Sequence, residues 1–376
     1  MKRSILSIII VITMVFSLTA CGSKKTDESP ATSKETTKET ATVTEEATTD
    51  AGSTDLLNPA NYVSDKEKSE WTIAVIVKDA TSDWFKRMQV GVDDFGNKMA
   101  VNVIQKGPAS ADAASQVQLV EDMMNQGVDA LCIIPIDPGA LESVLEEAMN
   151  RGIVVVSHEA SNLKNTLYDV EAFTAESFGE TMMDQLAQAM GKKGKYAQMV
   201  AYTTSTTHME YSNAEHNFQV ENYPDMSLIN DTVPSAESEE KVDTAYSKAK
   251  EILKANTDLA GFTGAASVDI LGEAQAVEEL GLSDQVSIVG VGTPNACKEY
   301  VHNGTISAVC LWDPALAGFA MCDVAYKILS GEEVGNGSDL ECEGYNSVSL
   351  KEGINRCLLG NAPLILKDDN IDNYDF

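Results

Sequence analysis

The chain has 376 residues, of which 43% are hydrophobic and 23% charged, and its formal net charge at pH 7 is −31. A protein this acidic repels nucleic acid and anionic lipid surfaces, which argues against nucleic-acid binding. The hydrophobic content is that of an ordinary globular protein, and the length allows two domains of common size.

The first 20 residues have the pattern of an export signal. Lys2 and Arg3 make a positive end, and the mostly apolar run 5–18 is too short for a comfortable membrane span. The motif Leu-Thr-Ala-Cys at 18–21 resembles the lipobox of bacterial lipoproteins, in which the signal is cut before the cysteine and the cysteine carries the lipid. We therefore expect residues 1–20 to be removed and Cys21 to be lipidated, which leaves a chain of charge −33 held to the membrane by its anchor. A plain cleaved signal that happens to precede a cysteine is the alternative.

The segment 21–70 is rich in Thr, Ser, Glu, Lys and Ala and has no apolar periodicity. Such a segment cannot bury enough surface to offset its chain entropy, so we predict a disordered tether. Its average reach would be about 35–40 Å.

The six cysteines after Cys21 show no compact spacing. Most of them fit small buried hydrophobic positions. Cys342 and Cys357 could pair near the C-terminus, but the sequence leaves their connectivity open.

From residue 71 onward, continuous apolar runs alternate with amphipathic helical patterns. The apolar runs predict strands buried on both faces of a parallel sheet, at 72–77, 101–104, 130–134, 153–156, 197–201, 227–233, 261–263 and 286–291. The helical patterns lie at 84–99, 114–125, 140–150, 176–190, 239–255, 270–280 and 314–329. The region around His208 and His216 stays unassigned. Two strand–helix series of similar size predict an α/β fold of two doubly wound lobes, with a ligand cleft between the carboxyl ends of their strands.

Several motifs carry a family resemblance. The runs 116–120 (Gln-Val-Gln-Leu-Val), 126–130 (Gln-Gly-Val-Asp-Ala) and 136–141 (Ile-Asp-Pro-Gly-Ala-Leu) resemble type I periplasmic binding proteins for sugars. The runs 289–295 (Val-Gly-Val-Gly-Thr-Pro-Asn), 304–313 and 373–376 (Asn-Tyr-Asp-Phe) resemble the branch that contains the autoinducer-2-binding and rhamnose-binding proteins. The resemblance covers roughly residues 71–376.

This resemblance implies parallel-sheet lobes joined by a three-segment hinge. The crossings are expected near 159–162, at 312–313 and after about 345. The N-terminal lobe would then comprise 71–159 and 313–345, and the C-terminal lobe 160–312 and 346–376.

The resemblance also implies a function, that of a substrate-binding lipoprotein of an ABC importer. Such a protein binds a small sugar or polyol and delivers it to a membrane permease, whose partner ATPase supplies the energy. We expect a monomer without catalytic residues, cofactor, metal or nucleic acid, on the outer face of the cytoplasmic membrane, or in the periplasm of a cell with two membranes. The alternatives are an autoinducer-2 receptor and a sensor that presents its bound sugar to a membrane signalling receptor. An enzyme or a metal-binding lipoprotein is disfavoured, because the four histidines lack metal-ligand spacing and no nucleophile motif accompanies them.

Candidate binding residues follow the first predicted strand. Lys78 and Asp79 come directly after it, and Trp84 and Phe85 open the next helix. Sugar sites need aromatic faces and directed polar groups, which these residues supply, although the two aromatic residues could instead belong to the core. The resemblance implies that Lys78 binds the ligand, because the autoinducer-2 branch has a ligand-binding lysine at this place.

Three further candidates lie at the expected crossings. Autoinducer-2 receptors carry an aspartate where Glu159 stands, and a hinge carboxylate without a ligand role is the alternative. Trp312 and Asp313 could line the cleft, or they could simply span the lobes.

The remaining candidates depart from the autoinducer-2 pattern. Met209 and Glu210 stand where that receptor has an Asp-Gln pair, and Ala265 and Ser267 stand where it has proline and alanine. Because lost hydrogen-bond partners in a buried polar site cost more than lost apolar contact, we expect a related sugar or polyol rather than autoinducer-2. Gly292 lacks the aspartate of ribose-type and galactose-type proteins, which argues against those sugars.

Overall fold

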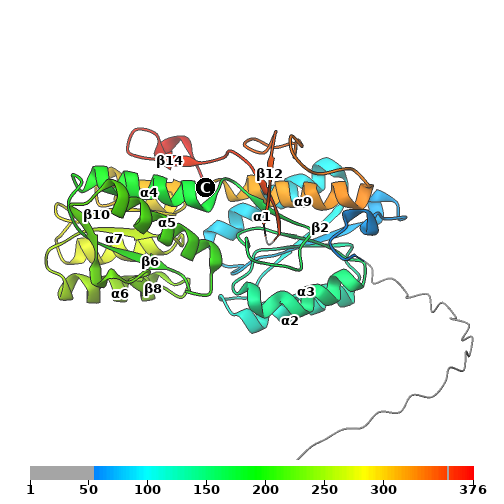
Figure 1. Cartoon of the computed structure of the whole chain (residues 1–376), viewed down its shortest axis with the longest axis horizontal. Helices are drawn as coiled ribbons and strands as arrows, with labels where there is room; N and C mark the ends of the chain where they lie inside the picture. The colour runs from blue at the N-terminus through cyan, green and yellow to red at the C-terminus, as the bar shows by residue number, and fades with distance from the viewer. Residues whose placement is uncertain (1–54, 354) are drawn as a thin grey trace, which may run out of the picture. The chain divides into compact units, whose positions relative to one another are not determined.

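A computed structural model describes residues 55–353 and 355–376 of the chain (Figure 1). The expected signal, Cys21 and the part of the expected tether at 21–54 lie outside the described residues. Within the described part, no helix combines the length and apolar character needed to cross a membrane.

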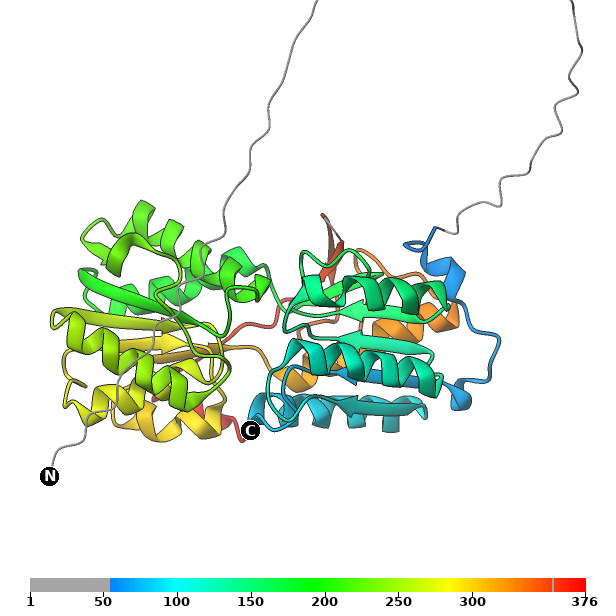
Figure 2. The ribbon, with the colours of Figure 1, turned by 90° about the horizontal axis from the view of Figure 1, so that it is seen from below.

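The first lobe is built on a seven-stranded sheet with the strand order β12-β13-β5-β4-β3-β1-β2. Its strands are β1 (Thr72–Ile76), β2 (Asn102–Lys106), β3 (Ala130–Ile133), β4 (Val154–Ser157), β5 (Tyr168–Glu171), β12 (Ser349–Glu352) and β13 (Arg356–Leu359). Neighbouring strands are parallel except β12 with β13. Helices α1 (Asp83–Met99) and α9 (Pro314–Ser330) pack on one face, and α2 (Ala113–Gln126) and α3 (Pro138–Asn150) on the other (Figures 1 and 2).

The second lobe has its own seven-stranded sheet, in the order β14-β11-β10-β9-β6-β7 with β8 paired to β6. Its strands are β6 (Gly194–Val200), β7 (Met226–Leu228), β8 (Ala236–Glu237), β9 (Leu259–Gly264), β10 (Ser287–Gly290), β11 (Ala308–Leu311) and β14 (Leu364–Leu366). Its helices are α4 (Ala175–Ala189), α5 (Thr206–Asn222), α6 (Val242–Ala255), α7 (Asp269–Glu279) and α8 (Pro294–His302). Helices α4 and α5 cover one face, and α6 and α7 pack together on the other (Figure 1). The predicted fold of two doubly wound parallel-sheet lobes is therefore confirmed.

Four short 3₁₀ helices complete the described secondary structure. They are η1 (Pro59–Tyr62), η2 (Lys68–Glu70), η3 (Ile229–Asp231) and η4 (Ile371–Asn373).

Two of the three predicted lobe crossings lie at other places. β5 pairs with β4 in the first sheet, so the chain first leaves that lobe after Glu171, at 172–174, and not near 159–162. β13 also belongs to the first sheet and β14 to the second, so the last crossing is at 360–363, and not after about 345. The sequence did not predict β5 because this strand buries two acidic residues, Asp169 and Glu171. The Asp169 carboxylate accepts a hydrogen bond of 2.8 Å from the Ser157 hydroxyl. The crossing at 312–313 lies where it was expected, between β11 of the second sheet and α9 of the first lobe.

The predicted tether extended too far, because residues 55–70 pack on the first lobe. Tyr62 is buried, the backbone N–H of Ser64 donates to the Leu329 carbonyl at 2.9 Å, and the Lys68 ammonium donates to the Tyr326 hydroxyl at 2.7 Å. Isolated anchors of this kind produce no periodic pattern, so the sequence did not distinguish this segment from a disordered one.

One glycine sets how closely α1 approaches the start of α9. A Cβ atom at Gly91 would lie 1.8 Å from the carbonyl oxygen of Ala315, which no side chain can tolerate. The glycine therefore lets α1 lie directly against the crossing at 312–313, and this contact positions Trp84 beside that crossing.

All six cysteines in the described part of the chain have free thiols. The pairing of Cys342 with Cys357, which the sequence left open, is therefore not formed. Cys342 is buried, and its thiol lies 3.6 Å from the Leu316 carbonyl oxygen.

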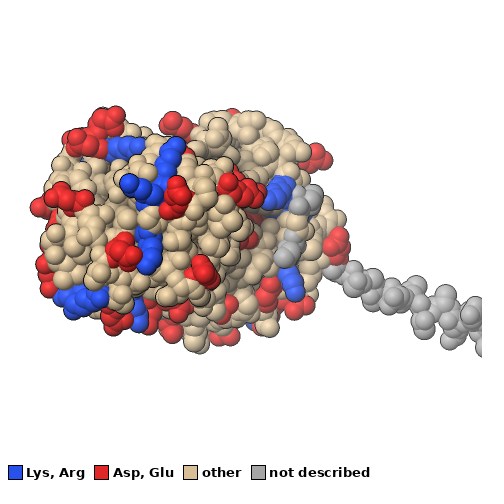
Figure 3. All heavy atoms as spheres, turned by 60° about the vertical axis from the view of Figure 1, so that its left-hand side comes forward, with Lys and Arg blue, Asp and Glu red and all other residues tan. Residues whose placement is uncertain are grey.

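Acidic residues are spread over the molecular surface. Figure 3 shows one face, on which Asp and Glu side chains are scattered with Lys and Arg between them.

Candidate ligand-binding site

A small cavity lies where the carboxyl ends of strands from both lobes meet, the usual ligand position in open α/β sheets. Its lining combines charged, polar and aromatic residues: Lys78, Ser82, Trp84, Phe85, Glu159, His208, Glu240, Ala265, Ala266, Ser267, Val291 and Trp312. The cavity volume is about 20 Å³, enough for about one water molecule. A sugar can enter only if the lobes separate here or these side chains move.

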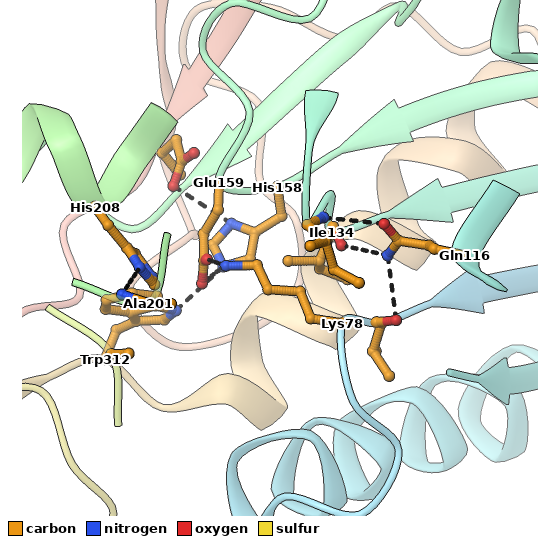
Figure 4. A network of polar contacts seen from close by, with 12 residues as sticks. Lys78, Gln116, Ile134, His158, Glu159, Ala201, His208 and Trp312 are labelled. Atoms are coloured by element: carbon orange, nitrogen blue, oxygen red, sulfur yellow. Dashed lines mark hydrogen bonds and ion pairs between the residues drawn. The ribbon is translucent and has the colours of Figure 1, made fainter. Parts of the chain in front are cut away.

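An ion pair between Lys78 and Glu159 is the most buried charged contact of the cavity. The Lys78 ammonium donates to the Glu159 carboxylate, and each side chain is at most 5% exposed (Figure 4). Burial alone raises the pKa of Glu159, but Lys78, aided by His158 and His208, more than offsets this effect and lowers that pKa to about 2. Burial likewise lowers the pKa of Lys78, and Glu159 together with Glu240 and Glu171 reverses that effect, so both groups stay charged.

A buried glutamine fixes the strand end that carries Lys78. The Gln116 amide nitrogen donates to the carbonyls of Val77 at 3.2 Å and Ile134 at 2.8 Å, and its amide oxygen accepts from the backbone N–H of Ile136 at 2.9 Å (Figure 4). Gln116 thus satisfies three backbone groups beyond the ends of β1 and β3. The position of Lys78 follows from this link.

His158 connects the cavity to the crossing at 312–313. Its Nδ1 lies 2.5 Å from the Val170 carbonyl oxygen, and the Trp312 indole N–H donates to its Nε2 at 3.2 Å (Figure 4). Burial lowers the pKa of His158, whereas Glu171 and Glu159 raise it and produce a net upward shift. The carboxylates therefore favour the charged form, but only the neutral ring with a proton on Nδ1 satisfies both contacts. We assign the neutral form to this arrangement.

His208 reaches the cavity from the first turn of α5 in the second lobe. It is buried, and its Nδ1 accepts a hydrogen bond of 3.4 Å from the backbone N–H of Ala201 (Figure 4). Burial, aided by the nearby charge of Lys78, lowers the pKa of His208 to about 3. The ring is therefore neutral, and its proton is on Nε2.

Aromatic residues form an apolar wall beside these charges. The rings of Trp84 and Trp312 meet edge to face with centroids 4.9 Å apart, and Phe173 and Phe178 pack against Trp312 from behind. The hydroxyl of Ser82 caps α1 by accepting from the backbone N–H of Phe85 at 3.4 Å. An aromatic wall next to buried polar groups suits a sugar, which has apolar faces and a polar rim.

A second, larger depression lies beside the hinge. This groove has a volume of about 900 Å³ and runs between α4 and α5 of the second lobe and β5, β12 and β13 of the first. Its walls include Glu171, Glu210, Tyr211, Lys351 and Asn355. Although it is larger, we place the ligand site at the small cavity, where strand ends converge and charged groups are buried.

Comparison with known proteins identifies the fold family. The family model described as a periplasmic binding protein domain matches residues 73–333, more than half of the chain. The chain belongs to this family. It has the type I periplasmic binding protein fold of two lobes and a three-segment hinge.

The known proteins that the chain resembles are binding proteins. The ribose import binding protein RbsB of Bacillus subtilis is 24% identical over 267 residues, which are 71% of this chain and 84% of that protein. Among solved structures, LsrB from Clostridium saccharobutylicum in complex with AI-2 is 25% identical with a TM-score of 0.74, and it covers 81% of this chain and 100% of its own. A solute-binding protein from Clostridium phytofermentas with bound L-rhamnose is 22% identical with a TM-score of 0.73, covering 81% and 98%.

Seven of the residues that the sequence nominated line the cavity of this binding-protein fold, and four do not. The seven are Lys78, Trp84, Phe85, Glu159, Ala265, Ser267 and Trp312.

The other four nominated side chains are engaged elsewhere. The Asp79 carboxylate accepts from the backbone N–H and the hydroxyl of Thr81, both at 2.7 Å. Asp313 caps α9 and forms a two-pronged ion pair with Arg87 at 2.8 and 2.6 Å. Both carboxylates are occupied by local partners, so they do not turn into the cavity.

Met209 and Glu210 lie on α5 and point away from the small cavity. Met209 packs against the core, and Glu210 faces the hinge groove, where it accepts a hydrogen bond of 2.5 Å from the Ser161 hydroxyl. Residues next to each other on a helix point about 100° apart, and in this structure neither Met209 nor Glu210 lines the small cavity. His208, one residue earlier, faces the cavity instead.

Sequence reasoning also missed Ser82, Glu240, Ala266 and Val291. Ser82 and Ala266 could have been found because they follow predicted strands, and Val291 because it is the last residue of one. Glu240 belongs to the acidic run 237–240, which resembles a solvated loop in sequence. Left-handed backbone at Glu239 and Glu240, with φ of 56° and 55°, brings Glu240 to the cavity.

Proposed function

We propose that this protein is the substrate-binding subunit of an ABC importer, with a small sugar or polyol as its ligand. The observation that carries the proposal is the cavity between the lobes, which joins a buried Lys78–Glu159 pair to an aromatic wall. Closure of the lobes around the ligand would replace its water shell with directed polar groups, and a permease would recognise the closed form.

The relatives support a sugar as the ligand class. Several of them are named for ribose, allose, xylose, rhamnose or AI-2. Lys78 and the carboxylate of Glu159 favour an autoinducer-2 receptor as the second candidate. The second lobe argues against this candidate, because His208, Ala265 and Ser267 line the cavity where the resemblance implies other residues in that receptor.

We further propose that the protein is exported and anchored through a lipid on Cys21. The motif at 18–21 supports this proposal. Cys21→Ser should move the protein from the membrane fraction to the soluble exported fraction and abolish incorporation of labelled palmitate. Continued membrane association of the variant, without label in either protein, would overturn the anchor.

Ligand binding can be tested with purified protein lacking residues 1–20. Thermal unfolding is measured against a panel of pentoses, hexoses, deoxyhexoses, polyols and AI-2. Stabilisation by a sugar or polyol, with a midpoint that rises with ligand concentration, supports the proposal. Stabilisation by AI-2 alone favours the receptor alternative. Stabilisation by divalent metal alone would contradict both the sugar-binding function and the receptor alternative. Loss of sugar uptake in a deletion strain separates an importer subunit from a sensor.

A further inference from the structure

The charges that line the cavity do not balance. Lys78 is already paired with Glu159, and Glu240 is a second carboxylate on the same cavity. In the described part of the chain, the Glu240 carboxylate has no hydrogen-bond or ion-pair partner. His208, the remaining titratable group of the lining, is neutral, so the lining carries one uncompensated negative charge.

Glu240 is held at the cavity by a strained turn between β8 and α6. Glu239 and Glu240 both have left-handed backbone, which costs about 1–3 kcal/mol for each non-glycine residue. The Glu239 N–H donates to the Ala201 carbonyl at 3.0 Å, and the Tyr202 hydroxyl donates to the Glu239 carbonyl at 3.2 Å. These contacts, with the bond from the Lys241 N–H to the Ser238 carbonyl at 3.1 Å, fix the turn.

The two adjacent glutamates of this turn have different surroundings. Glu239 is exposed, and its carboxylate pairs with the Lys241 ammonium at 3.2 Å. Glu240 is partly buried and borders Lys78, Glu159 and the aromatic wall. Burial raises the pKa of Glu240, and Lys78 opposes that shift. A carboxylate in such a place is stabilised by any cation that enters the cavity.

Other groups near the cavity do not supply that cation. The ring nitrogens of His158 contact the Val170 carbonyl and Trp312, and not Glu240. If Lys78 moved to pair with Glu240, the carboxylate of Glu159 would be left buried without a partner. The N-terminus of α1 contributes only a partial positive charge, and the Ser82 hydroxyl already satisfies one of its N–H groups. Among the groups of the lining, Glu240 is therefore the one best placed to meet a positive charge carried by the ligand.

We propose that Glu240 is a specificity-determining residue and that the ligand is a sugar or polyol carrying a protonated amine. The proposal rests on the proposed function, because it assigns the ligand class of the same cavity. The amine forms a charge-assisted hydrogen bond with Glu240, while the hydroxyl groups face the Lys78–Glu159 pair and the carbon skeleton lies on the aromatic wall. A neutral sugar could offer Glu240 only hydroxyl donors, which form weaker hydrogen bonds with a carboxylate than a protonated amine does.

The test compares matched sugars at about pH 6, where a sugar amine is protonated. Binding of D-glucosamine, D-galactosamine and D-mannosamine is measured by calorimetry against the parent hexoses and the neutral N-acetyl forms. We expect at least one amine to bind more tightly than its parent by about tenfold or more. Glu240→Gln, which keeps the shape and removes the charge, should erase that preference. Glu239→Gln is the matched control, and it should leave the preference unchanged.

The outcomes separate this inference from the function on which it rests. If hexoses bind but their amines bind equally or more weakly, or if Glu240→Gln keeps the amine preference, the inference is wrong and the sugar-binding function stands. If neither hexoses nor their amines bind, and no other sugar or polyol stabilises the protein, both fail. A shift of the melting temperature of Glu240→Gln by less than a few degrees confirms that the variant is folded.

Discussion

The small cavity and the hinge groove differ in almost every property that is used to find a binding site. The groove is far larger, about 900 Å³ against about 20 Å³. The cavity contains a buried ion pair at the point where strands of both sheets end, and the groove does not. In a protein whose lobes close on a ligand, the functional space is small when the lobes are together. The proposed function therefore places the site by the convergence of strand ends and by buried charge, and not by volume.

The largest effect should follow from removal of Lys78. Lys78→Ala should weaken the best ligand by about tenfold or more, because the variant loses the donor that faces the cavity. It should also destabilise the protein by about 3–5 kcal/mol, since Glu159 is left buried without a partner. Calorimetry measures the affinity and urea unfolding measures the stability.

The double variant Lys78→Ala/Glu159→Ala separates these two effects. Removal of both charges should recover much of the lost stability without recovering affinity. Glu159→Ala alone should also bind about tenfold or more weakly. Normal binding by both single variants would contradict the placement of the site at the cavity.

The next effect concerns pH and His208. The pKa of His208 is lowered to about 3 in the folded protein, whereas it returns to about 6.5 on unfolding. Between these values the unfolded chain binds the extra proton, so the contribution of His208 to stability is complete above pH 6.5 and is lost as pH falls below it. The loss should approach about 1.4 kcal/mol per pH unit.

The variant His208→Gln isolates this effect from other titrations. The difference in unfolding free energy between wild type and variant should shrink as pH falls from about 6.5 to about 5. Glu159 does not interfere in this window, because its stabilising effect is lost only below its unfolded pKa of about 4.5. A difference that stays constant with pH would mean that His208 is not a buried neutral group at the cavity.

The smallest effect should come from the groove. Glu210 lines it and contacts Ser161, so Glu210→Ala removes one hydrogen bond of 2.5 Å and costs about 1 kcal/mol of stability. Ligand affinity should stay within about twofold of wild type, because Glu210 faces away from the cavity. An affinity loss as large as that of Lys78→Ala would reverse the roles of groove and cavity.

Much of the fold could be predicted from the sequence because its strands are buried on both faces. Continuous apolar runs such as the one in β1 and the capped helices between them make the α/β series evident. β5 is the exception: its Asp169 and Glu171 break the apolar pattern, and this one strand displaced the first crossing. Pairing between distant segments, such as β13 with β5, depends on tertiary contacts that no local pattern reports.

The site could be predicted where it depends on strand ends and could not where it depends on loop conformation. Lys78 and Glu159 follow directly from the ends of β1 and β4. His208 requires the phase of α5, a helix whose apolar residues form no clear stripe. Glu240 requires two successive left-handed residues, which an acidic run does not signal.

A crystal structure of the protein with the sugar or amino sugar that binds it most tightly tests the central claim most directly. The ligand should lie between the lobes, with its polar groups on Lys78 and Glu159 and its ring against Trp84 or Trp312. The cavity should be enlarged by rotation of the lobes about the crossings at 172–174, 312–313 and 360–363. A ligand held in the hinge groove by Glu210 and Lys351, with the Lys78–Glu159 pair undisturbed, would contradict the account.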